Sequence, residues 1–254
     1  MPALVFDCDG VLADTERDGH LPAFNAAFAE VGLPIRWSEA DYAVKLRVGG
    51  GKERIASAFT PELDEAAGVS SDDERSAWIA RLHKRKTALF TERVEGGLLP
   101  GRPGIRRLIA DALAAGWTVA VASTSAEASV RAVLRYAAGE DSYPHCHVFA
   151  GDIVAAKKPA PDIYLKVLAD LALDPADCVV VEDSGIGVAA AVAAGLVTVV
   201  TVSSFTADDD FTGAALVLSD LGDPGSPPTV LAAPAGFVPG DFVTLDDLAV
   251  LISH

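Results

Sequence analysis

The fold of this chain is decided by the stretch Leu4-Val5-Phe6-Asp7-Cys8-Asp9-Gly10-Val11. Its first residues form a short apolar run, which predicts a buried strand of a parallel sheet. Two aspartates follow, and residues i and i+2 of an extended segment point to the same side. Both carboxylates can therefore address one site at the edge where open α/β sheets bind ligands. The alternative interpretation is a capped strand end followed by an Asp-Gly turn.

The composition of the 254-residue chain predicts one large domain, or one domain with an insert. A formal net charge of −16 argues against non-specific nucleic-acid binding and against a basic membrane-binding patch. Three scattered cysteines without a CxxC pair indicate neither a disulfide framework nor a zinc site, which fits a reducing cytoplasm. We expect no signal peptide and no transmembrane segment. We therefore expect a cytoplasmic monomer without a nucleic-acid or membrane partner.

After Asp9 the strand pattern stops, and apolar residues recur with helical spacing until about residue 95. Helices are expected over 20–31 and 39–46, in a short segment ending at residue 59, and in a long segment that begins after Ser71. Ser71 and Glu74 have the spacing of a capping box. The sequence therefore predicts an all-helical insert.

Beyond the Gly- and Pro-rich segment 96–104, helix and strand alternate, which predicts a parallel sheet with helices on both faces. The expected strands are 117–122, 148–150, 178–182 and 197–202. The expected helices are 104–115, 126–137, 161–172 and 185–194. In the tail we expect a strand at 216–218, a surface loop over 222–240 and a last helix over 245–252. The predicted fold is a Rossmann-like, doubly wound α/β core (1–14 and 96–254) with an inserted helical cap domain (15–95).

Polar residues suited to phosphate chemistry flank four of these elements. They are Asp7 and Asp9, the run Ser123-Thr124-Ser125, the pair Lys157-Lys158, and the pair Glu182-Asp183. Because all strands of a parallel sheet end at the same edge, we expect these groups to lie together.

The residue types indicate phosphoryl transfer through a carboxylate nucleophile. A carboxylate can attack an anionic phosphate only where charge is neutralised, and Mg²⁺ held by Asp7 and Asp183 would do that. A lysine adds positive charge on the phosphoryl oxygens, and the Ser123 hydroxyl is a further donor. Asp9 can protonate the leaving oxygen and then activate water.

The motifs Asp7-Cys8-Asp9-Gly10-Val11, Ser123, Lys158-Pro159 and Glu182-Asp183 resemble, in order and spacing, those of the haloacid dehalogenase superfamily. The helical insert resembles that superfamily's C1 cap. The resemblance implies that Asp7 is the nucleophile and Asp9 the acid/base. It implies that Mg²⁺ is bound by the Asp7 side chain, the Asp9 backbone carbonyl and Asp183, with Glu182 beside them. It favours Lys158 over Lys157, since the family lysine directly precedes the proline.

Three further stretches, 14–20, 49–55 and 82–87, resemble CbbY-type phosphatases, relatives of which dephosphorylate xylulose 1,5-bisphosphate; β-phosphoglucomutase is a close cousin. The sequence departs from many relatives at Glu127 and Ser129, near a position where they place a substrate-contacting asparagine. The candidate substrate contacts implied are Glu16, His20, Gly50, Gly51, Lys52, Arg54, Lys86, Thr124 and Ser125.

For the cap residues, two interpretations stay open. The segment 49–52 could bind an anion at a helix N-terminus, or form an ordinary flexible loop. Lys86 could extend to solvent along the apolar stripe, or face the active site. His20 and Arg54 could contact a second phosphate, or lie on a helix surface. Glu16 could bind a sugar hydroxyl, or merely favour the start of a helix.

Val48 favours a phosphatase over a mutase, since mutase relatives carry a lysine just before the cap glycine. A mutase must hold a bisphosphate in two orientations, and one missing charge-assisted contact is worth about 2 kcal/mol. We expect a Mg²⁺-dependent phosphatase that acts on a small phosphorylated sugar, such as a ketose bisphosphate, through an aspartyl-phosphate. A sugar phosphomutase resembling β-phosphoglucomutase is the alternative, and a non-catalytic phosphate-binding module is the distant one.

Overall fold

The computed structural model describes residues 2–48, 50–237 and 239–252, and the chain divides into two compact units. The α/β unit consists of Met1–Thr15 and Leu99–His254, and the helical unit of Glu16–Leu98. Within the described residues, no helix combines the length and the apolar character needed to cross a membrane.

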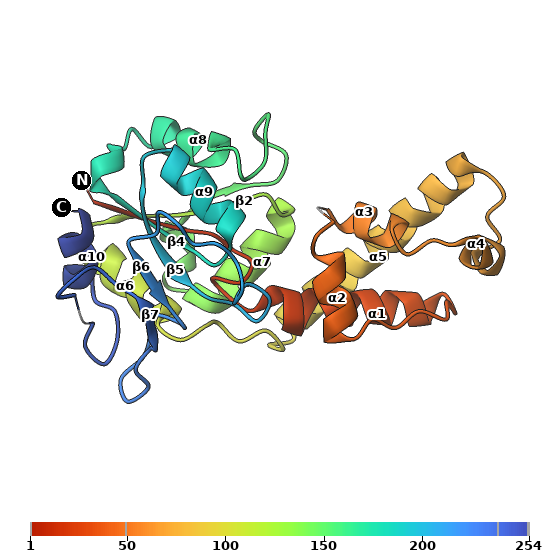
Figure 1. Ribbon diagram of the computed structural model, residues 1–254, viewed down its shortest axis with the longest axis horizontal. Coiled ribbons are helices and arrows are strands. Elements are labelled where there is room, and N and C mark those ends of the chain that lie inside the picture. Colours follow the sequence, from red (N-terminus) through yellow and green to blue (C-terminus); the bar gives the residue numbers. More distant parts are fainter. Residues whose placement is uncertain (1, 49, 238, 253–254) are drawn as a thin grey trace. The chain divides into compact units, whose positions relative to one another are not determined.

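A seven-stranded sheet of order β3-β2-β1-β4-β5-β6-β7 forms the centre of the α/β unit (Figure 1). The strands are β1 (Ala3–Phe6), β2 (Thr118–Ser123), β3 (His147–Ala150), β4 (Cys178–Glu182), β5 (Val197–Thr201), β6 (Leu216–Leu218) and β7 (Val230–Ala232). All neighbours pair in parallel except β6 and β7, which are antiparallel. The predicted α/β fold is confirmed. The prediction that 222–240 is only a surface loop is wrong, because β7 lies within it.

Helices cover both faces of this sheet, as a parallel sheet requires (Figure 1). They are α6 (Ile105–Ala114), α7 (Glu127–Ala138), α8 (Asp162–Asp170), α9 (Gly185–Ala193) and α10 (Leu245–Ile252). On one face, α8 and α9 pack against alternate strand residues such as Val5, Ala120 and Val180. Because side chains alternate along a strand, the buried Leu4 and Phe6 point to the opposite face.

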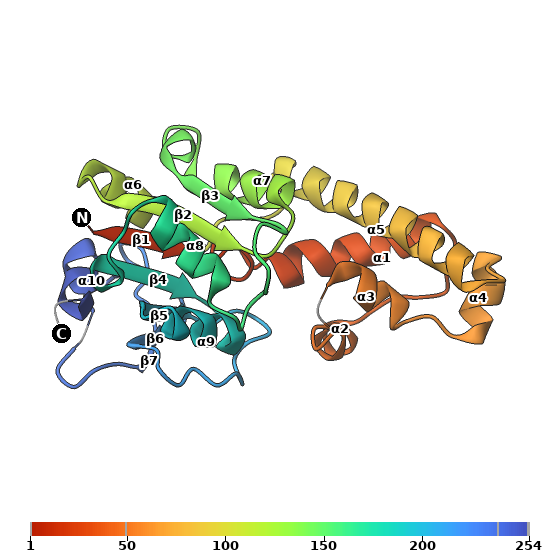
Figure 2. The ribbon, with the colours of Figure 1, turned by 90° about the horizontal axis from the view of Figure 1, so that it is seen from above.

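Among its described residues, the helical unit begins with a single π-helical turn, Glu16–His20, and continues with five helices. They are α1 (Leu21–Glu30), α2 (Glu39–Lys45), α3 (Gly51–Ala56), α4 (Pro61–Ala67) and α5 (Asp72–Glu95). Figure 2 shows α1 running alongside the long α5. The rings of Phe24, Phe28, Trp37 and Tyr42 form an aromatic core, with neighbouring centroids 4.8–6.2 Å apart.

Two details of the helical unit differ from the prediction. Helix α4 was not expected, and it is preceded by the N-cap residue Thr60, whose side chain accepts a hydrogen bond from the Leu63 amide. At the start of α5, Ser71 caps the Glu74 amide, but the Glu74 carboxylate accepts from Ser70 instead of closing the expected capping box.

The two segments that join the units lie beside each other inside the α/β unit. Ala13 and Gly101 form an antiparallel bridge, and the Arg102 amide donates to the Leu12 carbonyl at 3.0 Å. These segments are thereby tied to the turn that follows β1.

Candidate active site

A buried cluster of four ionisable groups lies at the carboxyl edge of the sheet. Lys158 Nζ lies 2.6 Å from Asp7 Oδ1 and 2.7 Å from Glu182 Oε1, and it also donates to the Ala122 carbonyl at 3.1 Å. Asp183 is buried beside Glu182. The chain therefore brings together the ends of β1, β2 and β4 with the loop that precedes α8.

Strand register explains this convergence. Phe6 pairs with Val121 on one side and with Val181 on the other, so β1, β2 and β4 end together. The Asp7 amide still donates to the Val181 carbonyl at 2.9 Å, which holds Asp7 in line with β4. Residues placed just after each strand must then meet.

Tyr164 belongs to this cluster and was missed by the sequence analysis. Its hydroxyl donates to Glu182 Oε1 at 2.5 Å, and its ring centroid lies 4.9 Å from Lys158 Nζ. Tyr164 is fully buried on α8, six positions after the motif lysine. Its position on the apolar stripe of that helix gave no sign of a polar role.

Asp9 is held by two hydroxyl groups. Thr15 Oγ1 donates to Asp9 Oδ1 at 2.6 Å, and Ser125 Oγ donates to Asp9 Oδ2. Ser125 was predicted as a substrate contact, whereas the structure gives its hydroxyl to Asp9. Thr15 was not predicted, although it lies in a quoted motif. The two donors fix the orientation of a carboxyl group that is half-buried.

The other two residues of the Ser123-Thr124-Ser125 run differ in environment. Ser123 is buried, and its Oγ accepts from the Ser125 amide at 3.1 Å, which leaves its hydroxyl proton available for a phosphoryl oxygen. Thr124 is half-buried.

Burial dominates the electrostatics of the cluster. Desolvation raises the pKa of Asp7 to about 7, against the attraction of Lys158. Desolvation, followed by the charges of Glu182 and Asp7, raises the pKa of Asp183 well above its ordinary value. Desolvation acts to lower the pKa of Lys158, but the Asp7 and Glu182 carboxylates outweigh it and hold that pKa well above its usual value. Three carboxylates thus face one ammonium group in a buried place.

The cluster fits a divalent metal ion. Asp7, Glu182 and Asp183 each offer a carboxylate oxygen within 4.8 Å of the others, and oxygen is the ligand that Mg²⁺ prefers. Glu182 already accepts hydrogen bonds from Lys158, Tyr164 and the Asp183 amide. Asp7 and Asp183 are therefore the better ligands. A Cβ on Gly10 would overlap Asp183 Oδ2, so only glycine lets this carboxylate lie against the turn.

In the helical unit, Glu16, Tyr42 and Arg54 form a half-buried group. The Tyr42 hydroxyl donates to Glu16 at 2.5 Å, and Arg54 donates to Glu16 at 3.2 Å, to the Tyr42 hydroxyl at 2.9 Å and to the Val48 carbonyl at 3.1 Å. Arg54 is therefore part of an ion pair rather than a free group on a helix surface. Tyr42, an aromatic core residue, was missed as its partner.

Lys86 and His20 form a second group in the helical unit. Lys86 Nζ lies 2.9 Å from His20 Nδ1 and 4.5 Å from the Phe24 ring centroid. Only 6% of Lys86 is exposed. The interpretation in which Lys86 extends to solvent is therefore wrong.

Gly51 lies next to His83. A Cβ on Gly51 would come within 2.6 Å of His83 Nε2, so a side chain there would displace the histidine. Burial, followed by the charges of Lys86 and Lys52, lowers the pKa of His83 to about 4 and keeps the ring neutral near pH 7. Gly50 and Lys52 are exposed at the start of α3. Gly49, the first residue of the predicted anion loop, lies outside the described residues.

The model of the haloacid dehalogenase-like hydrolase family matches residues 1–195. Protein CbbY from Cupriavidus necator is 48% identical over 229 residues, which cover 89% of this chain and 88% of that protein. The crystal structure of a CbbY mutant from Rhodobacter sphaeroides in complex with xylulose 1,5-bisphosphate is similar, with a TM-score of 0.73, 36% identity, and coverage of 87% of this chain and 95% of that one. A putative β-phosphoglucomutase from Thermotoga maritima is similar as well, with a TM-score of 0.61, 30% identity, and coverage of 80% and 87%.

Proposed function

The chain belongs to the haloacid dehalogenase-like hydrolases, and from this membership we propose that it is a Mg²⁺-dependent phosphatase of small phosphorylated sugars. The substrate class we favour is a ketose bisphosphate such as xylulose 1,5-bisphosphate. The observation that carries the proposal is the buried cluster of Asp7, Lys158, Glu182 and Asp183. The similarity to CbbY bound to xylulose 1,5-bisphosphate supports the substrate class.

In the proposed reaction, an Asp7 oxygen attacks phosphorus, and the bond between phosphorus and the sugar oxygen breaks. Asp9 gives its proton to that leaving oxygen, which departs as the sugar hydroxyl. Water then attacks the aspartyl-phosphate, Asp9 takes the proton of that water, and inorganic phosphate leaves with Asp7 restored. The hydroxyl groups of Thr15 and Ser125 keep Asp9 in one orientation for both proton transfers.

Lys158 serves both the nucleophile and the phosphate. Its contact with Asp7 Oδ1 orients the carboxylate, and its contact with Glu182 fixes the ammonium group in turn. Asp7, Asp183 and the Asp9 backbone carbonyl would hold Mg²⁺, whose positive charge would offset the repulsion between carboxylate and phosphate. The Ser123 hydroxyl then donates to a phosphoryl oxygen.

We further propose that residues of the helical unit bind the part of the substrate remote from the transferred phosphate. Lys52, His20 and Arg54 would contact a second phosphate. Lys86 would face the active site, and Glu16 would bind a sugar hydroxyl. Gly50 and Gly51 would offer backbone amides, and Thr124 of the α/β unit would add a hydroxyl.

Lys52→Ala is expected to weaken binding of substrates that carry a second phosphate and to leave binding of other phosphate esters unchanged. Losing one charge-assisted contact, worth about 2 kcal/mol, should raise KM for a bisphosphorylated ketose roughly 30-fold. KM for p-nitrophenyl phosphate, which has no second phosphate, should change little. Steady-state kinetics on both substrates measure the difference, with Lys84→Ala as control, because Lys84 is also an exposed lysine of the helical unit. A KM increase of equal size for both substrates contradicts the assignment of Lys52.

A sugar phosphomutase is the second candidate, favoured by the similarity to the putative β-phosphoglucomutase. Val48 argues against a mutase, because its side chain offers no cation. Its carbonyl accepts a hydrogen bond from Arg54. A mutase would convert β-glucose 1-phosphate to glucose 6-phosphate faster than it releases inorganic phosphate.

A further inference from the structure

The turn after β1 is held by hydrogen bonds on both sides of Gly10. The Gly10 amide donates to the Ala13 carbonyl at 2.9 Å, and the Gly10 carbonyl accepts from the Arg102 guanidinium. Ala13 and Arg102 belong to the two segments that join the α/β unit to the helical unit. The Asp9 carbonyl, a proposed metal ligand, therefore lies in backbone that is hydrogen-bonded to both joining segments.

Arg102 also bonds to backbone carbonyls at the ends of two other strands, β5 and β6. Its guanidinium donates to the Thr201 carbonyl at 2.8 Å, to the Val202 carbonyl at 2.7 Å and to the Ser219 carbonyl. These carbonyls follow or end β5 and β6, so they belong to the rigid sheet. A planar fork of five N–H donors can satisfy several such acceptors at once, whereas a lysine ammonium cannot match that spread.

The turn after β1 packs directly against Asp183. Gly10 has φ of +80°, and a Cβ there would overlap Asp183 Oδ2. Arg102, bonded to the Gly10 carbonyl, and Asp183, packed against Gly10, therefore meet at the same turn.

We propose that Arg102 is a positioning residue of the metal site. It holds the Asp9–Gly10 turn against Asp183 by fastening the Gly10 carbonyl to the ends of β5 and β6, so that the metal-binding oxygens are preorganised. This inference rests on the proposed Mg²⁺-dependent function. Groups that orient metal ligands typically change metal affinity by about 10- to 100-fold when they are altered.

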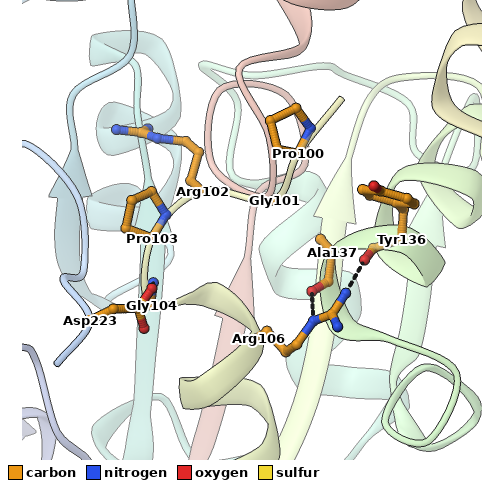
Figure 3. Close-up of a pocket in the computed structure, with 9 residues that line it drawn as sticks. All are labelled: Pro100, Gly101, Arg102, Pro103, Gly104, Arg106, Tyr136, Ala137 and Asp223. Atoms are coloured by element: carbon orange, nitrogen blue, oxygen red, sulfur yellow. Dashed lines mark hydrogen bonds between the residues drawn. The ribbon is translucent and has the colours of Figure 1, made fainter. Parts of the chain in front are cut away.

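Two nearby arginines supply matched controls. Arg106 donates to the carbonyls of Tyr136 at 2.8 Å and Ala137 at 3.3 Å, and Arg107 donates to those of Val243 and Gly222, both at 2.9 Å. Figure 3 shows the side chains of Arg102, on the segment before α6, and Arg106, on α6, extending in opposite directions. All three arginines hold backbone carbonyls, but among them Arg102 is the one bonded to the turn beside Asp183.

The test is a Mg²⁺ titration of the metal-free full-length protein by isothermal calorimetry. Arg102→Lys should raise the Mg²⁺ Kd at least about 10-fold. Arg106→Lys and Arg107→Lys should leave this Kd within about twofold of wild type, even where they lower Tm. In hydrolysis of p-nitrophenyl phosphate, the Mg²⁺ concentration for half-maximal rate should rise in parallel for Arg102→Lys, and excess Mg²⁺ should restore kcat. If Arg102→Lys does not fold, Arg102→Gln is titrated in the same way.

The outcomes separate this inference from the proposed function. Wild-type binding of Mg²⁺ together with an unchanged Kd in the Arg102 variant overturns the positioning role and leaves the phosphatase proposal standing. An equal loss of affinity in all three arginine variants also overturns it, because that result indicates a general loss of structure. Failure of the wild-type protein to bind Mg²⁺ contradicts both.

Discussion

Asp7→Asn is expected to abolish phosphate release while leaving the fold intact. The amide keeps an oxygen that can accept from Lys158, as Asp7 Oδ1 does at 2.6 Å, but it cannot form an aspartyl-phosphate. The kcat for p-nitrophenyl phosphate measures the loss, and circular dichroism checks the fold. Asp170→Asn, at an exposed surface ion pair, is the control and should keep wild-type turnover.

The same variant should change how stability depends on pH. Burial raises the pKa of Asp7 from 3.8 to about 7, so the metal-free folded protein holds a proton that the unfolded chain releases. This contribution makes wild-type stability fall as pH rises from about 4 to about 7. In Asp7→Asn that part of the decline should disappear, so its Tm at pH 8 without metal should equal or exceed that of wild type. Turnover at the wild-type rate in Asp7→Asn contradicts the mechanism.

Lys158→Met is expected to have the largest effect on stability. The side chain of Lys158 is 7% exposed, and its removal leaves Asp7 and Glu182 buried without their cation. Breaking a buried ion pair in this way typically costs about 3–5 kcal/mol. The loss should be larger at pH 8 than at pH 5, because Asp7, whose pKa burial raises to about 7, is protonated at pH 5 and no longer adds unpaired charge. Urea unfolding at both pH values measures it.

Lys157→Met is the matched control for this prediction. Lys157 is the adjacent residue, but its side chain is 59% exposed and pairs with the exposed Asp152. Its replacement should change the free energy of unfolding by no more than about 0.5 kcal/mol. A similar loss for the Lys157 and Lys158 variants would mean that the buried network does not stabilise the fold.

Local patterns were sufficient to predict the sheet and the meeting of its strand ends. Each buried strand is a short apolar run, and parallel pairing places the residues that follow the strands at the same edge of the sheet. This is why Asp7, Lys158 and Asp183 could be grouped before the structure was known. The partners that orient them could not be found in this way. Arg102 bonds to a carbonyl 92 positions away in sequence, and Tyr164 to a carboxylate 18 positions away.

The elements that were missed are short and depend on context. Strand β7 has three residues, all exposed, and exists through its pairing with β6. Helix α4 contains no buried residue, so it shows no apolar stripe. The burial of Lys86 depends on His20, 66 positions away, and on the ring of Phe24 from α1, in addition to Phe90 one turn further along α5. Such non-local packing is invisible to a periodicity argument.

The central claim is tested most directly by incubating the wild-type protein with xylulose 1,5-bisphosphate and measuring inorganic phosphate release, with Mg²⁺ and with excess EDTA. The account predicts rapid release with Mg²⁺ and none with EDTA. Release that is unaffected by EDTA, or no release from this or any other phosphorylated sugar, would contradict it. So would conversion of β-glucose 1-phosphate to glucose 6-phosphate that is faster than any phosphate release.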